Sequence, residues 1–119
     1  PAAARAKAYG IWCVVSKDDG THLGDAGLIE KEVDGVAEVE VIYILRPEHW
    51  GQGLGTEIAT ALVAHAFGPR DRARVVALIH PDNAASARVA EKAGLSFDRE
   101  TVRRGGKTLR VYVRHRTRD

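Results

Sequence analysis

The sequence predicts an α/β fold: a mixed, mostly antiparallel sheet with a central parallel β-α-β step, in a single domain spanning residues 1–119. Three observations predict it. Short β-branched and apolar runs alternate with turn-forming clusters. Two other segments repeat their apolar residues at helical spacing. The first of these helices connects two apolar strands, and such a connection requires the strands to be parallel. The expected order is β-β-β-α-β-α-β-β.

The first half of the chain is expected to form strands joined by short turns. Residues 1–8 are small and polar, and we expect a tail or a frayed helix end there. The last strand of this half is the clearest, because the hairpin signal Asp34-Gly35 precedes it and Pro47 ends it. The three strands are expected over residues 9–15, 22–30 and 36–45.

The second half is expected to contain two helices and three strands. Leucine, isoleucine and alanine recur at helical spacing from Leu54 to Ala66, and Gly68 stops that helix. A second helix is expected from about Asn83 to Ala93, with a glycine after it for the left-handed stop. The strands are expected over residues 74–79, 95–102 and 108–114.

Composition excludes several classes of function. The 18 basic and 16 acidic residues give a net charge of +2, so no nucleic-acid partner is expected. The apolar runs are too short for a membrane span, which needs about 20 residues. The single Cys13 excludes an internal disulfide and a cysteine-based metal site, and no histidine pair has a spacing such as His-x₃-His, so we expect no metal. With no charged-then-apolar leader at the start, a cytoplasmic location is expected.

The segment Trp50–Thr56 contains three glycines in five residues, between a strand and a helix. Glycines let the backbone turn sharply and approach a ligand, and the helix after them offers free N–H groups. The segment is therefore either an anion cradle, suited to a phosphate, or a helix-entry turn without a ligand. Two known phosphate loops fail on spacing, because no Lys follows Gly55 and position 56 is not glycine.

The segment resembles the acetyl-CoA loop of the GNAT superfamily of N-acetyltransferases, Arg/Gln-x-x-Gly-x-Gly/Ala at the end of the fourth strand. Gly53 and Gly55 match the two small positions, and Trp50 stands where Arg or Gln is usual. The spelling Pro-Glu-His-Trp-Gly-Gln-Gly over residues 47–53 is similar to the Rim-type branch, which acetylates ribosomal-protein N-termini. That branch typically has Trp at this position.

A second block supports the resemblance. Asn-Ala-Ala-Ser at 83–86, followed by Glu-Lys-Ala-Gly-Leu at 91–95, is similar to the family's Asn-x-x-Ser and Glu-Lys-x-Gly-Phe, with Leu95 in place of the usual Phe. The resemblance covers about residues 9–115. The family normally begins with a further strand and one or two helices, so residues 1–8 are expected to be at most a remnant of them, and the family's N-terminal elements are expected to be missing.

The resemblance implies an acetyl-CoA-dependent N-acetyltransferase, with acetyl-CoA as cosubstrate and an amine as acceptor. In the family the main chain at the end of the fourth strand binds the pantetheine arm, because the next parallel strand splays away there. Tyr43 is expected to contribute main-chain groups at this point. The expected cofactor-binding residues are Ile44, Leu45, Gln52, Gly53, Leu54, Gly55, Thr56, Asn83 and Ser86.

Three residues are candidates for catalysis. Glu40 matches a Glu that branch members often carry, and it could accept the amine proton; alternatively, Glu38 and Glu40 line a solvated face. Ser86 could protonate the leaving thiolate, or only cap its helix. Tyr112 is a further acid candidate, with core packing as the alternative.

Two hypotheses for the whole chain follow. It is expected to acetylate a primary amine, either a protein N-terminus or a small molecule, by direct attack on the thioester. The alternative is a catalytically silent acyl-CoA-binding or regulatory domain. We also expect a homodimer, formed through the outer C-terminal strand Thr108–Arg114 or by exchange of N-terminal segments.

Overall fold

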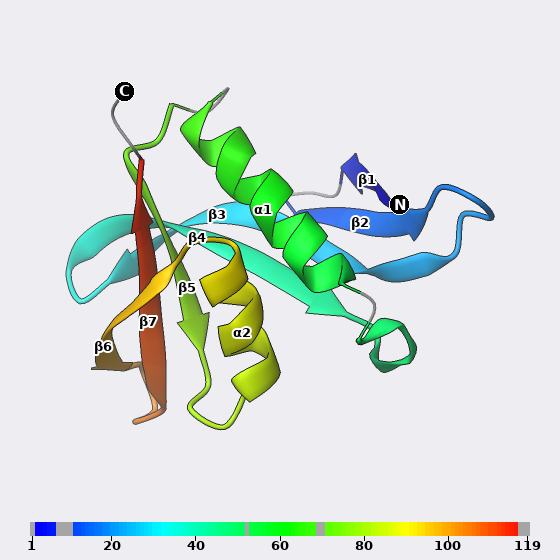
Figure 1. Ribbon diagram of the computed structural model, residues 1–119. Coiled ribbons are helices and arrows are strands. Elements are labelled where there is room, and N and C mark those ends of the chain that lie inside the picture. The colour runs from blue at the N-terminus through cyan, green and yellow to red at the C-terminus, as the bar shows by residue number, and fades with distance from the viewer. Residues whose placement is uncertain (1, 7–10, 52, 69–70, 117–119) are drawn as a thin grey trace.

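A seven-stranded sheet organises the part of the chain that the computed structural model describes, which is residues 2–6, 11–51, 53–68 and 71–116 (Figure 1). The strand order is β1-β2-β3-β4-β5-β7-β6. The elements are β1 Ala2–Ala6, β2 Ile11–Ser16, β3 His22–Val33, β4 Val36–Leu45, the 3-10 helix η2 Pro47–His49, α1 Leu54–Phe67, β5 Arg74–Ile79, α2 Ala84–Lys92, β6 Ser96–Val102 and β7 Thr108–His115.

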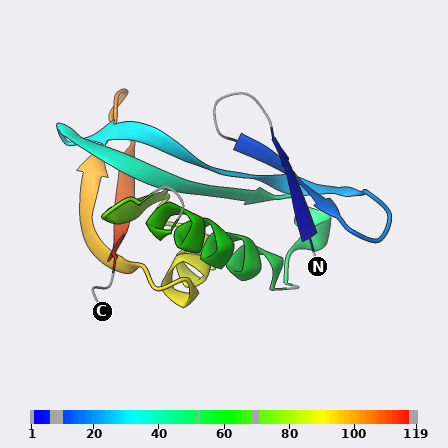
Figure 2. The ribbon, with the colours of Figure 1, turned by 90° about the horizontal axis from the view of Figure 1, so that it is seen from above.

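The parallel step is where it was predicted. β4 and β5 are parallel, with Glu40 opposite Val76, whereas the other neighbouring strands are antiparallel. Helix α1 connects β4 to β5, and both α1 and α2 lie on the same side of the sheet (Figure 2). The predicted fold class is therefore confirmed.

The main core lies between the sheet and the two helices. Val39 and Val41 of β4 pack there with Val63 of α1 and Ala90 of α2. Because neighbouring residues of a strand point to opposite faces, the β4 residues that alternate with Val39 and Val41 face away from both helices. One face of β4 is thus buried by α1 and α2, and the other lies on the helix-free face of the sheet.

The β3–β4 hairpin has the predicted turn. Asp34 and Gly35 have φ values of 51° and 81°, the left-handed conformation that a tight hairpin requires. The pairing continues from Val33–Val36 to Gly24–Leu45. Near its far end, a Cβ at Gly24 would collide with the main-chain oxygen of Ile44, so only glycine lets the two strands approach this closely.

The prediction of a tail or frayed helix end over residues 1–8 is wrong for the residues that the structure describes. Ala2–Ala6 forms β1 and pairs antiparallel with β2, from Ala2–Ser16 to Ala6–Trp12. Alanine favours helices, but the open edge of β2 offers main-chain hydrogen bonds that an isolated segment lacks. Residues 9 and 10, at the start of the expected first strand, lie outside the described residues.

The prediction that Thr108–Arg114 is the outer C-terminal strand is also wrong. β7 pairs with β5 on one side and with β6 on the other. After α2 the chain first runs along the sheet edge as β6 and then returns between β6 and β5. Turn chemistry predicts the β6–β7 hairpin but not which of its two strands pairs with β5 and which forms the sheet edge. The described sheet therefore has β1 and β6 as its edges.

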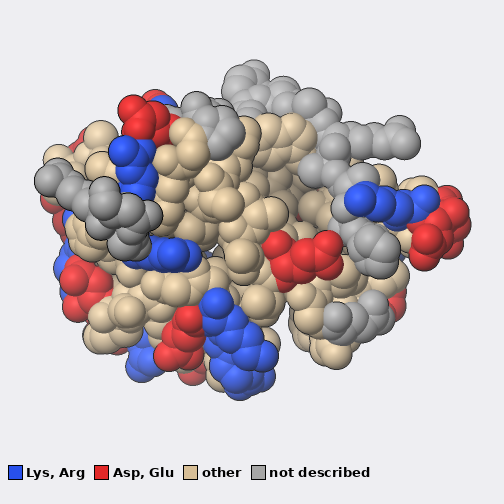
Figure 3. Space-filling model, turned by 45° about the horizontal axis from the view of Figure 1, so that its top comes forward, with Lys and Arg blue, Asp and Glu red and all other residues tan. Residues whose placement is uncertain are grey.

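The charged side chains are distributed without a single dominant sign. Blue and red groups are scattered over the face in Figure 3, with uncharged areas between them. Several charged side chains of the protein form ion pairs, such as Arg74 with Glu38 and Arg99 with Asp34. Neither helix in the described part of the chain has the length and apolar character that crossing a bilayer requires.

Candidate functional site

A groove of about 490 Å³ opens where the end of β4, the start of α1 and the start of α2 meet. Three separate parts of the sequence supply its walls. The strand end and the glycine-rich turn are close in sequence, whereas the α2 residues come from beyond β5. The lining residues are Tyr43, Ile44, Leu45, His49, Trp50, Gly51, Gly53, Leu54, Gly55, Thr56, Asn83, Ala85, Ser86, Arg88, Val89 and Lys92.

Most residues predicted to bind a cofactor border this groove. The structure brings together two residues of the strand end, four of the turn and helix start, and two at the start of α2, its N-cap included. Gln52 lies outside the described residues. The predicted residues that line the groove are Ile44, Leu45, Gly53, Leu54, Gly55, Thr56, Asn83 and Ser86.

The glycines of the turn have different structural tasks. Gly53 has φ 77° and caps the start of α1, so it takes a left-handed conformation that side chains disfavour. The first hydrogen bond of α1 runs from Glu57 N–H to Gly53 O at 3.1 Å, so the preceding N–H groups are outside the helical ladder. Gly55 instead lets the helices approach, because a Cβ there would lie 3.2 Å from Val89 of α2. The turn can hold an anion at the positive end of the α1 dipole.

β4 and β5 separate before β4 reaches its groove-lining end. Among the described residues, the register joins these strands only at Glu40–Val76, well before β4 ends at Leu45. The main chain near that end is thereby exposed to a ligand on its β5 side. The indole N–H of Trp50 donates to the Leu45 main-chain oxygen at 3.0 Å, so that oxygen already has one partner.

Tyr43 is a functional candidate whose side chain the sequence-based prediction did not include. Its hydroxyl donates to the Ser86 main-chain oxygen at 3.1 Å and lies 3.4 Å from Ser86 Oγ. Burial raises the pKa of Tyr43 above its ordinary value of 10, an effect that Tyr112 reinforces and the Ser86 hydrogen bond opposes. The phenol therefore stays protonated at neutral pH and remains a proton donor at the wall of the groove.

The start of α2 is set by a side-chain cap. Asn83 Oδ1 accepts a hydrogen bond from Ser86 N–H at 3.0 Å, which is the usual N-cap interaction. The cap is therefore formed by Asn83, and Ser86 Oγ instead lies against Tyr43. Both residues border the groove, so capping and ligand contact do not exclude one another here.

Basic side chains on α2 also border the groove. Arg88 and Lys92 are exposed and lie four residues apart, which puts them on the same face of the helix. His49 of η2 lines the groove as well. The sequence contained a signal for Arg88 and Lys92, since basic residues four positions apart on a helix share one face.

Glu40 does not line the groove but lies on the helix-free face of the sheet. The alternative prediction, that Glu38 and Glu40 line a solvated face, is wrong, because they are only 4% and 7% exposed. Each has a basic partner: Glu40 accepts from Lys31 Nζ at 3.0 Å, and Glu38 pairs with Arg74. Glu40 lies opposite Val76, at the point where β4 and β5 part.

Tyr112, the weaker acid candidate, is packed in the core. It is 5% exposed and belongs to the same cluster as the helix-facing side chains of β4. The Phe97 ring contacts it edge-on, with ring centroids 5.8 Å apart. It is not among the residues that line the groove. The side-chain environment therefore agrees with the core-packing alternative.

Comparison with known proteins gives a consistent result. The family model of the acetyltransferase (GNAT) domain matches residues 2–96. An uncharacterized protein of Bacillus subtilis, YkkB, is 36% identical over 110 residues, which are 91% of this chain and 63% of that protein. The chain thus spans less than two thirds of this relative's length.

Solved structures share the fold. A GNAT-family acetyltransferase of Bordetella pertussis, described there as putative, has a TM-score of 0.77 and 29% identity, covering 92% of this chain and 67% of its own. The acetyltransferase yncA of Salmonella typhimurium, solved with its cofactor acetyl-CoA, has a TM-score of 0.71 and 26% identity, covering 88% of this chain and 64% of its own.

Proposed function

Because this chain belongs to the GNAT acetyltransferase family, we propose that it transfers an acetyl group from acetyl-CoA to a primary amine. The acceptor is either a protein N-terminus, as the Rim-like spelling of residues 47–53 indicates, or a small-molecule amine. The observation that carries the proposal is the groove itself. It is lined by the start of α1, whose first N–H groups lie outside the helical ladder, and by the paired hydroxyls of Tyr43 and Ser86.

The residues of the groove fit this cosubstrate. CoA carries phosphates, which the N–H groups after Gly53 and the cations Arg88 and Lys92 would hold. Its pantetheine arm carries amides, which suit the main chain of β4 where β5 no longer pairs with it. When bound, acetyl-CoA supplies an acetyl thioester. This chain supplies the groups that position the thioester and move protons.

Two proton transfers accompany the reaction. The amine nitrogen forms a bond to the thioester carbonyl carbon, and the bond from that carbon to sulfur breaks. The Tyr43 hydroxyl is proposed to give its proton to the departing sulfur. Glu40 is proposed to take the proton that the amine loses, directly or through water, from the helix-free side of the gap between β4 and β5. Lys31 holds the Glu40 carboxylate in place.

The proposal is tested by measuring CoA thiol release from acetyl-CoA with a panel of primary amines. The panel includes peptides with free N-termini, a polyamine and an amino sugar. We expect release that depends on one class of amine, together with a product whose mass has gained one acetyl group. Binding of CoA without transfer to any amine would instead favour the alternative, a silent acyl-CoA-binding domain.

The change Glu40→Gln tests the proposed base. Glutamine keeps the shape of the side chain and removes its basicity, so turnover is expected to fall at least about tenfold while CoA binding stays nearly intact. Glu38→Gln is the matched control, since Glu38 lies on the same strand and face and also has a basic partner. An unchanged pH–rate profile for Glu40→Gln would assign the base to Glu38 or to a water chain.

We also propose a homodimer in which β6, the strand that the structure places at the sheet edge, contacts the second copy. Phe97 and Val102 of this strand are 53% and 68% exposed. An edge strand with apolar side chains favours pairing with a second copy. Light scattering at tens of micromolar protein is expected to give a molar mass of about twice 12.9 kDa. Val102→Lys places a charge on the contact and is expected to weaken the dimer, so that the measured mass falls. A mass near 12.9 kDa for the unaltered chain would contradict the dimer.

A further inference from the structure

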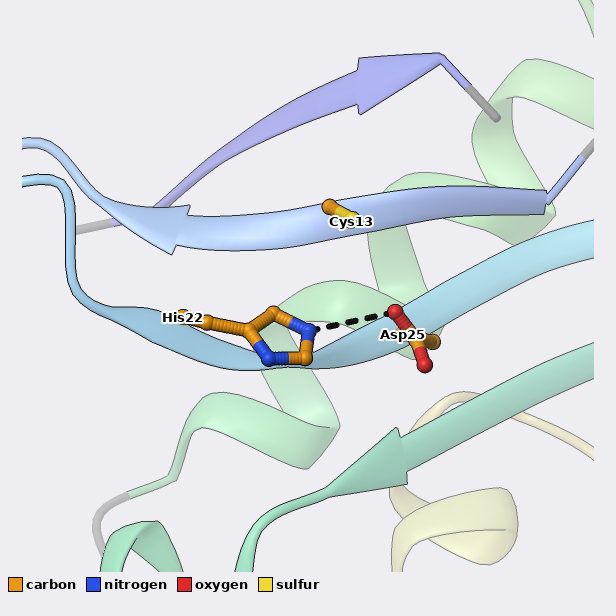
Figure 4. Close-up of side chains that lie close together, drawn as sticks. All are labelled: Cys13, His22 and Asp25. Atoms are coloured by element: carbon orange, nitrogen blue, oxygen red, sulfur yellow. Dashed lines mark hydrogen bonds and ion pairs between the residues drawn. The ribbon is translucent and has the colours of Figure 1, made fainter.

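A cysteine, a histidine and an aspartate gather on β2 and β3, outside the groove. The thiol sulfur of Cys13, a ring nitrogen of His22 and a carboxylate oxygen of Asp25 all lie within 4.8 Å of one another (Figure 4). His22 Nε2 is 3.2 Å from Asp25 Oδ1. None of the three side chains has a role in the proposed acetyl transfer.

An irregularity in the strand pairing creates this cluster. In a regular strand, His22 and Asp25 would point to opposite faces, since they are three residues apart. Here Cys13 pairs with Asp25 and Val15 pairs with His22, so the register skips Leu23. Cys13 and Val15 share a face of β2, and cross-strand partners share that face. The bulge therefore turns His22 to the side of Cys13 and Asp25.

We propose that Cys13, His22 and Asp25 bind one divalent transition-metal ion of the zinc type. Thiolate, imidazole and carboxylate are the three ligand types that proteins offer to zinc, and sulfur with nitrogen disfavours magnesium or calcium. Donor atoms around tetrahedral zinc lie about 3.3–3.6 Å apart, given bonds of about 2.0–2.3 Å. The His22–Asp25 pair, at 3.2 Å, is close to this spacing, and the sulfur needs to move by on the order of 1 Å.

The site is accessible and leaves one coordination position open. The His22 and Asp25 side chains are 41% and 32% exposed, and Cys13 is half-buried, so an ion can enter from solvent. Three protein ligands leave the fourth tetrahedral position to water or to a donor from a bound molecule. On binding, the thiol proton passes to solvent and the sulfur bonds the metal as thiolate.

The site is separate from the groove but lies one strand away from it. Asp25 pairs with Ile44, a residue that lines the groove. All three ligands are on the helix-free face of the sheet, the face that also carries Glu40. The sequence has neither a histidine pair at helical spacing nor a second cysteine, and the expectation of no metal rested on these two features. A bulged pair of strands assembles ligands at spacings that neither pattern covers.

The test is a titration of the full chain with cobalt(II) under reducing conditions, after removal of metals by a chelator. Cobalt(II) replaces zinc in such sites and absorbs in the near ultraviolet when a thiolate binds it. We expect this thiolate-to-cobalt band to saturate at one equivalent and to disappear when one equivalent of zinc is added. The readout needs neither acetyl-CoA nor turnover, so it is independent of the proposed function.

Variants assign the ligands. Cys13→Ser is expected to abolish the band, and His22→Ala and Asp25→Asn are each expected to weaken cobalt binding at least about tenfold. His115→Ala, at the exposed end of β7, is the control and is expected to change nothing. Absence of the band in the unaltered chain would overturn the proposal. So would unchanged affinity in both the His22→Ala and Asp25→Asn variants.

Discussion

Replacing Gly53 with valine is expected to abolish CoA binding. Gly53 has φ 77° and caps α1, so its conformation aims the first N–H groups of the helix into the groove. A β-branched side chain strongly disfavours this conformation, and it would also occupy the space that a phosphate must approach. The loss is measured by titrating the folded variant with CoA in a calorimeter.

A control separates loss of the site from simple backbone strain. Gly35 has φ 81°, and a Cβ there would meet nothing within 4 Å, as is also true at Gly53. Gly35→Val therefore introduces similar strain in the β3–β4 turn, far from the groove, and is expected to reduce stability while leaving CoA affinity unchanged. Undiminished affinity in a folded Gly53→Val protein would refute the assignment of the turn.

Replacing Tyr43 with phenylalanine is expected to lower turnover about 10²-fold with CoA affinity nearly unchanged. The phenol is proposed to protonate the departing sulfur, and phenylalanine keeps the packing while removing the proton. Because burial raises the pKa of Tyr43 above 10, the donor form persists as pH rises through neutrality. The rate is therefore expected to fall only above pH 10 on account of this group, and the variant is expected to lack that alkaline limb.

Tyr112→Phe is the matched control for Tyr43→Phe. Tyr112 is a buried member of the core cluster and Tyr43 is a partly buried phenol packed against it, but only Tyr43 lines the groove. A core phenol that does not contact the substrate is expected to change the rate by less than about twofold. A fall in rate with Tyr112→Phe, together with an unchanged rate with Tyr43→Phe, would transfer the role of acid to Tyr112.

Local patterns in the sequence predict much of the fold. Apolar periodicity and turn residues identify β4 and β5 with the bounds that the structure has, Val36–Leu45 and Arg74–Ile79. The order of the strands in the sheet is harder to predict, because hydrogen bonds to an existing sheet edge can override the local conformational preference of a segment. Ala2–Ala6 forms a strand for this reason. β7 lies between β5 and β6 because the position of the β6–β7 hairpin depends on its pairing with β5.

The candidate site is predictable where one segment forms it, and less so where distant segments meet. The glycine turn and Asn83 are visible as motifs, and both border the groove. The hydroxyl contact between Tyr43 and Ser86 joins residues on different elements, so it depends on how α2 packs against β4. The Cys13, His22 and Asp25 cluster depends on a bulge that no local pattern marks.

A crystal structure of the chain with CoA would show directly whether the groove between β4, α1 and α2 is the CoA site. We expect the pyrophosphate to accept hydrogen bonds from the main chain that follows Gly53 and the CoA sulfur to lie near the Tyr43 hydroxyl. We also expect the pantetheine arm to run along β4 where β5 departs from it. CoA bound outside this groove, or a sulfur far from Tyr43, would contradict the proposed binding mode.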